Sequence, residues 1–261
     1  MAYLKFISMA FQRSLSYRVE YFTGVLNAFL YIFIFTSVWM ALIPVGESVG
    51  GLTQADMVAY AVLSTLIKVS INRVESLVSN RVKSGEIAVD LMKPFSIPLM
   101  LLCDQVGTSL FHLFARAVPM LIFCLLIFDI DLPVTFEILV KFLPVYVLAF
   151  LMFFSMFFII STMAFFFVEV LPFWIFFFAL ITLTSGAIIP LDFFPPALSE
   201  VLLYTPFPYL YYFPTMVLMG RETLLAYPEI LLRSSMILSV TGGLGLAFYN
   251  LGLRKLTIAG G

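Results

Sequence analysis

The fold of this chain is decided by the segment FLPVYVLAFLMFFSMFFIISTMAFFFV (142–168), in which no residue is charged. About 20 apolar residues in a helix cross the hydrocarbon core of a bilayer, which is roughly 30 Å thick. The whole chain of 261 residues has the same character, because 62% of it is hydrophobic and only 11% is charged. A soluble domain is about 25% charged, since water must cover its surface. The composition therefore indicates an all-α integral membrane protein.

Windows with few or no charges predict six membrane-spanning helices. They cover 22–43, 55–78, 104–128, 142–167, 171–190 and 232–252. The second window starts at a capping-box pair, Thr53 and Asp56, and contains Lys68, whose long side chain can extend to the interface. Arg116 interrupts the third window, and the alternating pattern of a membrane β-barrel is not found. We expect a single domain, 21–261, built as a helical bundle.

Residues 1–20 precede the first window and have a different pattern. Leu4, Ile7, Phe11 and Leu15 recur at helical spacing among charged residues. This spacing predicts an amphipathic helix that lies in the membrane interface. A frayed polar tail is the alternative.

The positive residues predict the orientation of the spans. With the N-terminus inside, nine lie in the inner segments: Lys5, Arg13, Arg18, Arg73, Arg81, Lys83, Lys93, Arg254 and Lys255. Three lie outside: Lys141, Arg221 and Arg233. The outer segments carry acidic residues, Asp129 and Asp131 among them. We therefore expect a multi-pass protein with both termini in the cytoplasm.

The inner stretch from Asn80 to Leu102 contains RVKSGEIAVDLMKP (81–94), which does not fit a simple loop. The run from Glu86 to Met92 predicts a short helix, because an acid favours a helix N-terminus and Pro94 prevents continuation. Such a helix can dock into a groove on a cytoplasmic partner. A solvated loop carrying positive charge is the other interpretation, and the residues alone do not decide between them.

The outer segment from Gly186 to Tyr227 is as apolar as the spans but is broken by proline. It includes SGAIIPLDFFPPALSE (185–200) and TPFPYLYYFPTMVLMG (205–220). No continuous helix tolerates this density of proline, and broken backbone at membrane depth must be satisfied by protein or by a cavity. We expect a re-entrant or interfacial helical hairpin that caps the outer end of the bundle. A surface loop is the alternative.

Three polar side chains fall inside the third window: Asp104, His112 and Arg116. Intramembrane charges usually face a bundle interior and have a partner. A substrate path or gate is one interpretation, and a structural ion pair is the one we favour. Glu169 marks the tight inner turn between the fourth and fifth windows, where it either contacts a partner or simply holds the turn in water.

Several catalytic patterns are not found in the sequence. There is no G-x-x-x-x-G-K-[ST] loop, no G-x-S-x-G and no H-E-x-x-H, and His112 is the only histidine. We therefore expect no catalytic residue, no metal site and no cofactor bound by this chain. A net charge of −1 argues against a nucleic-acid partner. Energy for any transport must come from another protein.

The order of these features resembles the ABC-2 type transporter permeases, in particular the short bacterial permeases encoded beside a separate ATPase. The resemblance rests on two groups of residues. The first follows the second window: Arg81, Gly85, Glu86, Asp90, Leu91 and Pro94. The second lies in the outer segment: Ser185, Gly186, Pro190, Pro206, Phe207, Pro214 and Gly220. It covers essentially the whole chain.

The resemblance implies a permease subunit of an exporter in a bacterial inner membrane. Two permeases, identical or paralogous, would pair in the lipid bilayer above two ATP-binding cassette ATPase subunits that carry ATP and Mg. The first group of residues, together with Glu169, would couple to the ATPase. The second group, with Asp192, would form an outer lid or gate. A membrane-embedded lipid-acting enzyme and a stand-alone secondary transporter are the alternatives.

Overall fold

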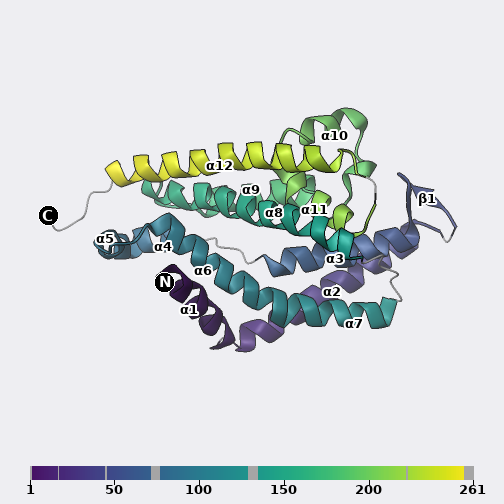
Figure 1. Cartoon of the computed structure of the whole chain (residues 1–261), viewed down its shortest axis with the longest axis horizontal. Coiled ribbons are helices and arrows are strands. Elements are labelled where there is room, and N and C mark those ends of the chain that lie inside the picture. The colour runs from purple at the N-terminus through teal and green to yellow at the C-terminus, as the bar shows by residue number, and fades with distance from the viewer. Residues whose placement is uncertain are drawn as a thin grey trace.

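The computed structural model describes residues 2–16, 18–44, 46–71, 77–128, 135–221 and 223–255. Long helices run side by side along the longest axis of the molecule (Figure 1). The elements are α1 (Ala2–Ser16), α2 (Arg18–Leu42), β1 (Ser48–Val49), β2 (Leu52–Thr53), α3 (Gln54–Ser70), α4 (Leu77–Ser84), α5 (Glu86–Leu91), α6 (Ile97–His112), the π-helix η1 (Leu113–Ala117), α7 (Val118–Phe128), α8 (Phe136–Thr162), η2 (Met163–Phe165), α9 (Leu171–Thr184), η3 (Leu191–Phe193), α10 (Pro196–Leu202), η4 (Phe207–Tyr209), α11 (Tyr212–Leu218) and α12 (Tyr227–Lys255).

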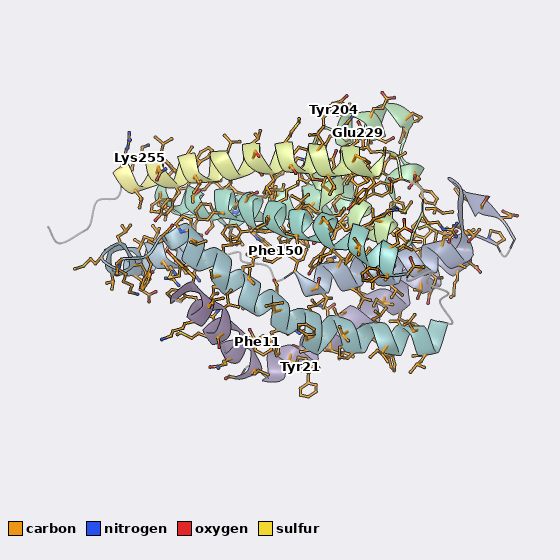
Figure 2. All side chains as sticks on the ribbon, viewed as in Figure 1. Phe11, Tyr21, Phe150, Tyr204, Glu229 and Lys255 are labelled. Carbon is orange, nitrogen blue, oxygen red and sulfur yellow. The ribbon has the colours of Figure 1, made fainter. Side chains whose placement is uncertain are left out.

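The two ends of the bundle are built differently. The small helix α5 lies at one end, near the start of α1 and the end of α12, and we call this the α5 end (Figure 1). The broken segment with α10 and the β1–β2 hairpin lie toward the other end, the α10 end. Lys255 and the pair Tyr204 and Glu229 accordingly lie toward opposite ends (Figure 2).

Four helical segments of the described chain are long and apolar enough to cross a membrane. They are Tyr21–Leu42, Ile97–Ile127, Phe136–Phe165 and Tyr227–Lys255. These segments match the first, third, fourth and sixth predicted spans. The third begins earlier than 104 because α6 starts at Ile97, after its N-cap Ser96. The helices α6, η1 and α7 then form one continuous rod. The chain is therefore a helical multi-pass membrane protein, and six spans remain a prediction.

The second and fifth predicted spans correspond to shorter helices. The expected helix over 55–78 is too long, because α3 ends at Ser70 and Ile71 turns into extended backbone. Residues 72–76 of that prediction, and the outer acids within 129–134, lie outside the described residues. Lys68 lies with its ammonium 4.5 Å from the ring centroid of Tyr31, half-way along α2, and its reach to an interface stays a prediction. The fifth span is α9, which ends at Thr184.

The start of α3 and the turn before it follow from their local sequence. Thr53 and Asp56 form the predicted capping box, in which each side chain bonds the other residue's backbone N–H. A two-stranded antiparallel hairpin, β1–β2, precedes this cap and was not expected. Its turn uses Gly50 and Gly51, which have φ of 60° and 79°, a conformation that costs glycine little.

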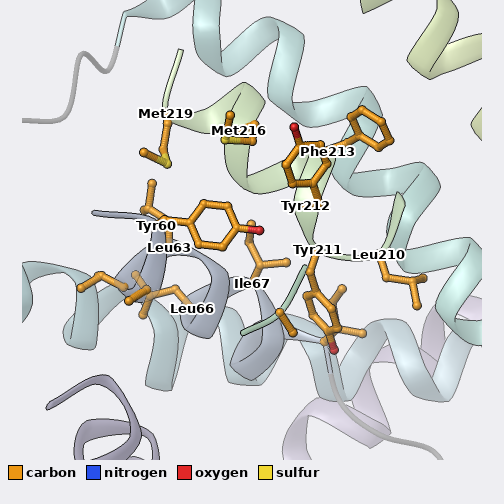
Figure 3. Close-up of a cluster of buried hydrophobic side chains, with 14 of the residues drawn as sticks. Tyr60, Leu63, Leu66, Ile67, Leu210, Tyr211, Tyr212, Phe213, Met216 and Met219 are labelled. Atoms are coloured by element: carbon orange, nitrogen blue, oxygen red, sulfur yellow. The ribbon is translucent and has the colours of Figure 1, made fainter. Parts of the chain in front are cut away.

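The main hydrophobic core lies where α3, α8 and α11 meet. In Figure 3, Tyr60, Leu63 and Ile67 of α3 lie opposite Tyr212 and the residues around it. A second, smaller cluster lies at the α5 end; its buried members are Val78, Ile87, Ile97, Met100, Leu101, Phe158 and Tyr249. This smaller cluster joins α4, α5 and α6 to the ends of α8 and α12.

The amphipathic leader is a helix, but it packs on protein as well as presenting an apolar face. The helix α1 lies along α6, and Gly107 is a point of close approach. A Cβ at Gly107 would lie 2.3 Å from the carbonyl oxygen of Ile7. Leu4 and Leu15 stay exposed, which agrees with an interfacial position.

Candidate coupling surface and outer segment

The short helix predicted in the inner stretch from Asn80 to Leu102, here called the coupling segment, is present as α5. Gly85 separates it from α4, and its φ of 77° is a left-handed conformation that favours glycine. Ile87 is buried in the smaller core cluster and attaches α5 to the bundle. Pro94 follows the helix in an exposed turn, which agrees with its predicted role in ending the helix.

Asp90 is the centre of a charge cluster that holds this segment together. Its carboxylate pairs with the Arg81 guanidinium and accepts a hydrogen bond of 2.7 Å from Lys93 Nζ. The side chain of Asp90 is only 6% exposed. Burial alone would raise the pKa of Asp90, but the hydrogen bonds from Lys93 and Arg81 outweigh it and hold that pKa below its usual value.

The opposite face of α5 points away from the protein. Glu86 and Leu91 are exposed, Val89 is 59% exposed and Met92, just after the helix, is 87% exposed. Glu86, Val89 and Met92 follow each other at three-residue spacing, so they share one face of the helix. The bundle therefore has an exposed surface at the α5 end that is partly acidic and partly apolar.

Glu169 lies in the turn between η2 and α9, far from α4 in sequence but next to it in space. Its carboxylate pairs with Lys83, with Nζ 3.0 Å from Oε1. The structure thus brings Glu169 to the segment with which the sequence grouped it. Lys83 was not among the predicted site residues, and only the fold reveals its part in the group.

The leader helix also contacts the coupling segment. Tyr3 Oη accepts a hydrogen bond of 3.3 Å from the backbone N–H of Ser96, and the rings of Phe6 and Phe95 meet edge to face with centroids 5.5 Å apart. Further along, Arg13 pairs with Asp104 at 2.7 Å. The ion partner of Asp104 is therefore on α1, and not within its own helix.

His112 and Arg116 lie at the junction of α6 and α7. His112 is buried at the end of α6, and Arg116 lies within the π-turn η1. The guanidinium carbon of Arg116 is 5.8 Å from the ring centroid of Tyr21. Arg116 is thus level with Tyr21, the first residue of the apolar stretch of α2.

The outer segment is broken as predicted, but much of it is core. Pro190 precedes η3, Pro206 precedes η4, Phe207 lies within η4 and Pro214 lies within α11. Every side chain from Tyr211 to Met216 is buried, and α11 lies between α3 and α8. The exposed apolar side chains of this segment include Leu198 and Val201 on α10 and Tyr204 just after it.

Hydrogen bonds attach the outer segment to α3. Gly186 has φ of 79°, and its carbonyl accepts a 2.6 Å hydrogen bond from Tyr60 Oη. A Cβ there would lie 2.7 Å from Tyr212 Cβ, so only glycine fits without a shift. Asp192 accepts a hydrogen bond of 3.1 Å from Tyr212 Oη.

The far end of the segment is anchored by charge. Gly220 ends α11 with φ of 64°, and the next residue, Arg221, pairs with Asp56. Asp56 therefore takes part in the capping box of α3 and also forms an ion pair at the end of the outer segment. The sequence did not suggest Asp56 or Arg221 as parts of this site, because the pair spans more than half the chain.

Within the described ranges, no group of three or more His, Cys, Asp and Glu side chains could hold a metal ion. The polar contacts described above hold helices together and place exposed groups at both ends of a bundle. This arrangement defines a multi-pass helical membrane protein whose two ends present different surfaces. A family model described as ABC-2 family transporter protein matches residues 25–260. The chain therefore belongs to the ABC-2 transporter family, as its sequence resemblance predicted. No curated protein matches the chain.

Proposed function

We propose that this chain is the membrane-spanning permease subunit of an ATP-driven exporter, whose ATP hydrolysis takes place on a separate ATP-binding cassette subunit. Membership of the ABC-2 family supports a transport component rather than an enzyme. The observation that carries the proposal is α5, a short helix attached to the bundle on one face and exposed on the other. Two permeases, identical or paralogous, would pair in an inner membrane with both termini cytoplasmic.

In this proposal the exposed face of α5 docks on the ATPase. Val89 and Met92 provide apolar anchors at helical spacing, which is how a helix binds in a groove, and Glu86 adds a charge on the same face. Ile87 and Asp90 hold the other face of α5 to the bundle. A movement of the docked ATPase would then displace the bundle together with α5, because the buried face of α5 is attached to the bundle.

Contacts around α5 offer two routes for this motion. One route runs from α4 through Lys83 to Glu169 and the start of α9. The other runs from Phe95 to α1, and from Arg13 on α1 to Asp104 on α6. Because α1 leads directly into α2, movement at the α5 end reaches the membrane helices on both sides of the bundle.

The outer lid is also part of the proposal, in a narrower form than the sequence suggested. The buried half of the segment, η4 and α11, fills the core between α3 and α8. The exposed part around α10 is better placed to change position without opening that core. We propose that α10 forms the movable part above the pathway, whereas η3 with Asp192 stays attached to the core, because Leu191 is buried there and Asp192 bonds Tyr212.

Co-purification tests the coupling. The permease is expressed with the P-loop ATPase of a neighbouring reading frame, and Val89→Asp and Met92→Asp are expected to lower the amount of ATPase retained by at least tenfold. A charge buried in an apolar groove is costly. The matched control is Val201→Asp, because Val201 is 62% exposed on α10 and lies at the other end.

Full retention of the ATPase by both α5 variants would remove α5 as the docking element. An active, monodisperse species without any ATPase would overturn the permease itself and favour a secondary transporter or a lipid-acting enzyme.

A further inference from the structure

A groove opens on the flank of the bundle between α2 and the η1–α7 rod. Its volume is about 340 Å³, and aromatic and aliphatic side chains form most of its wall. Phe22 and Leu26 at its edge are 68% and 58% exposed. Among the described side chains that line the groove, Arg116 is the only charged one. Phe11 and Tyr21 are labelled on this flank in Figure 2, away from Tyr204 and Glu229.

A proline sets the geometry of this groove. Pro119 has no N–H, so it cannot bond the carbonyl four residues earlier, which belongs to Ala115. Tyr21 Oη on α2 donates a 2.8 Å hydrogen bond to that carbonyl, so the backbone group freed by the proline has a partner. The π-turn η1 lies at the same place, and such turns often occur at functional sites.

The same tyrosine positions the cation. The Arg116 guanidinium lies over the Tyr21 ring and against Gly24, where a Cβ would come within 2.7 Å of Nη1. A larger residue at position 24 would displace the guanidinium from this wall of the groove. Pro119, Tyr21 and Gly24 thus act together to hold one positive charge beside an apolar surface.

The depth of the groove in the membrane follows from the register of its two walls. Tyr21 meets Ala115, and Phe29 meets Phe123 with ring centroids 5.3 Å apart, so the helices run in parallel with constant register. Tyr21 begins the long apolar segment of α2, which is where tyrosine marks a membrane interface. The groove therefore runs from a cation at the interface about 12 Å toward the bilayer centre.

We propose that this groove binds an anionic phospholipid, with its phosphate on Arg116 and part of one acyl chain along Phe29 and Phe123. An apolar channel with a cation at its interfacial end complements the lipid in both charge and polarity. The cation is at head-group depth, where one positive residue attracts anionic lipid by about 1 kcal/mol. The proposal depends only on the chain spanning a membrane, so it stands or falls separately from coupling to an ATPase.

Quenching by brominated lipid tests the site directly. Phe22→Trp places a fluorophore at the exposed edge of the groove, and the signal of Trp39 and Trp174 is subtracted with the parent protein. In phosphatidylcholine vesicles we expect dibromo-phosphatidylglycerol to quench the introduced tryptophan with a relative binding constant about fivefold above dibromo-phosphatidylcholine, the factor that about 1 kcal/mol supplies. Arg116→Gln in the same background should reduce this preference to about one.

Two further variants separate charge from structure. Arg116→Lys keeps the charge and should keep most of the preference, even if the fit to Tyr21 is poorer. Arg233→Gln is the matched control, because Arg233 also lies over an aromatic ring, that of Tyr204, but far from the groove. This control should leave the fivefold preference unchanged.

Three results would overturn the proposal. Equal quenching by the two lipids in the Phe22→Trp protein means that the groove takes acyl chains without regard to charge. A preference that survives Arg116→Gln places the anionic lipid elsewhere. Insensitivity to both brominated lipids means that a second copy of the chain or another protein covers the groove.

Discussion

Glu86 and Asp90 are two acids of one short helix, four residues apart, and their surroundings differ completely. The sequence resemblance grouped them as coupling residues of one kind. Glu86 is exposed, whereas Asp90 is buried against Arg81 and Lys93. Asp90 is therefore a positioning residue for α5, and its loss acts on the shape of the segment before it acts on any partner.

Replacing Asp90 should loosen α5 without preventing membrane insertion. We expect Asp90→Asn to weaken the local structure by about 1–2 kcal/mol, since charge-assisted hydrogen bonds are lost but the two cations are partly in solvent. Hydrogen exchange over 81–93 should become roughly tenfold faster. Glu86→Gln is the control and should leave exchange unchanged; equal effects of the two variants would contradict this division of roles.

The contribution of Asp90 also depends on pH in a definite direction. Its pKa is lowered in the folded protein, so the ionised form is favoured there and its stabilisation is complete above the unfolded value of about 4. The stabilisation is lost as the pH falls through the lower, folded pKa. Exchange over 81–93 should therefore accelerate below about pH 4 in the parent more than in Asp90→Asn. Identical pH profiles would show that other carboxylates govern this segment.

At the level of elements, the contact between α1 and α6 decides whether the leader helix α1 would move together with α6. It is close because Gly107 has no side chain and Ile7 and Ala10 fill the space. Arg13 and Asp104 then fix the relative position of the two helices. A leader that only floated in the interface would need neither contact.

Adding one methyl group at this crossing tests the packing. Gly107→Ala places a Cβ within 2.3 Å of the Ile7 carbonyl oxygen, so α1 must shift, at an expected cost of about 1–3 kcal/mol. Gly243→Ala on α12 meets nothing within 4 Å and should be neutral or stabilising, because alanine favours helix by up to about 1 kcal/mol. Thermal unfolding in detergent compares the two; equal Tm values would mean that α1 is not packed as described.

At the level of the whole molecule, α5 and α10 lie toward opposite ends of the bundle (Figure 1). The proposed function requires this separation, because an ATPase on one side of the membrane and an exit on the other need surfaces at opposite ends. Tyr211 belongs to the outer segment, but its side chain is 2% exposed in the main core, so a reporter of lid motion belongs on α10.

Thiol labelling in intact cells checks this arrangement. Cys103 and Cys124 are both buried, so background labelling by a membrane-impermeant maleimide should be low. We expect Leu198→Cys to react and Met92→Cys to react only after the cells are opened. Tyr211→Cys should stay protected in both cases because of burial. Labelling of Met92→Cys from outside would invert the proposed topology.

The sequence by itself determined that this protein lies in a lipid bilayer, where its main helices are, and where the chain between them is broken. Hydropathy over 20 residues, capping at Thr53 and proline at 190 and 206 are local properties, and they act through the chemistry of neighbouring residues. Even the family could be recognised from short groups of residues in a fixed order. Helix ends were less certain, because the end of α3 at Ser70 depends on what packs beside it.

The tertiary structure alone decided which polar groups meet. Arg13 with Asp104, Lys83 with Glu169 and Arg221 with Asp56 join residues far apart in the chain. No local pattern encodes these pairs, since each depends on the distance and rotation of two packed helices. The same reason applies to Pro119, whose missing N–H is a local fact, while the hydroxyl of Tyr21 reaches the freed carbonyl only because α2 lies alongside.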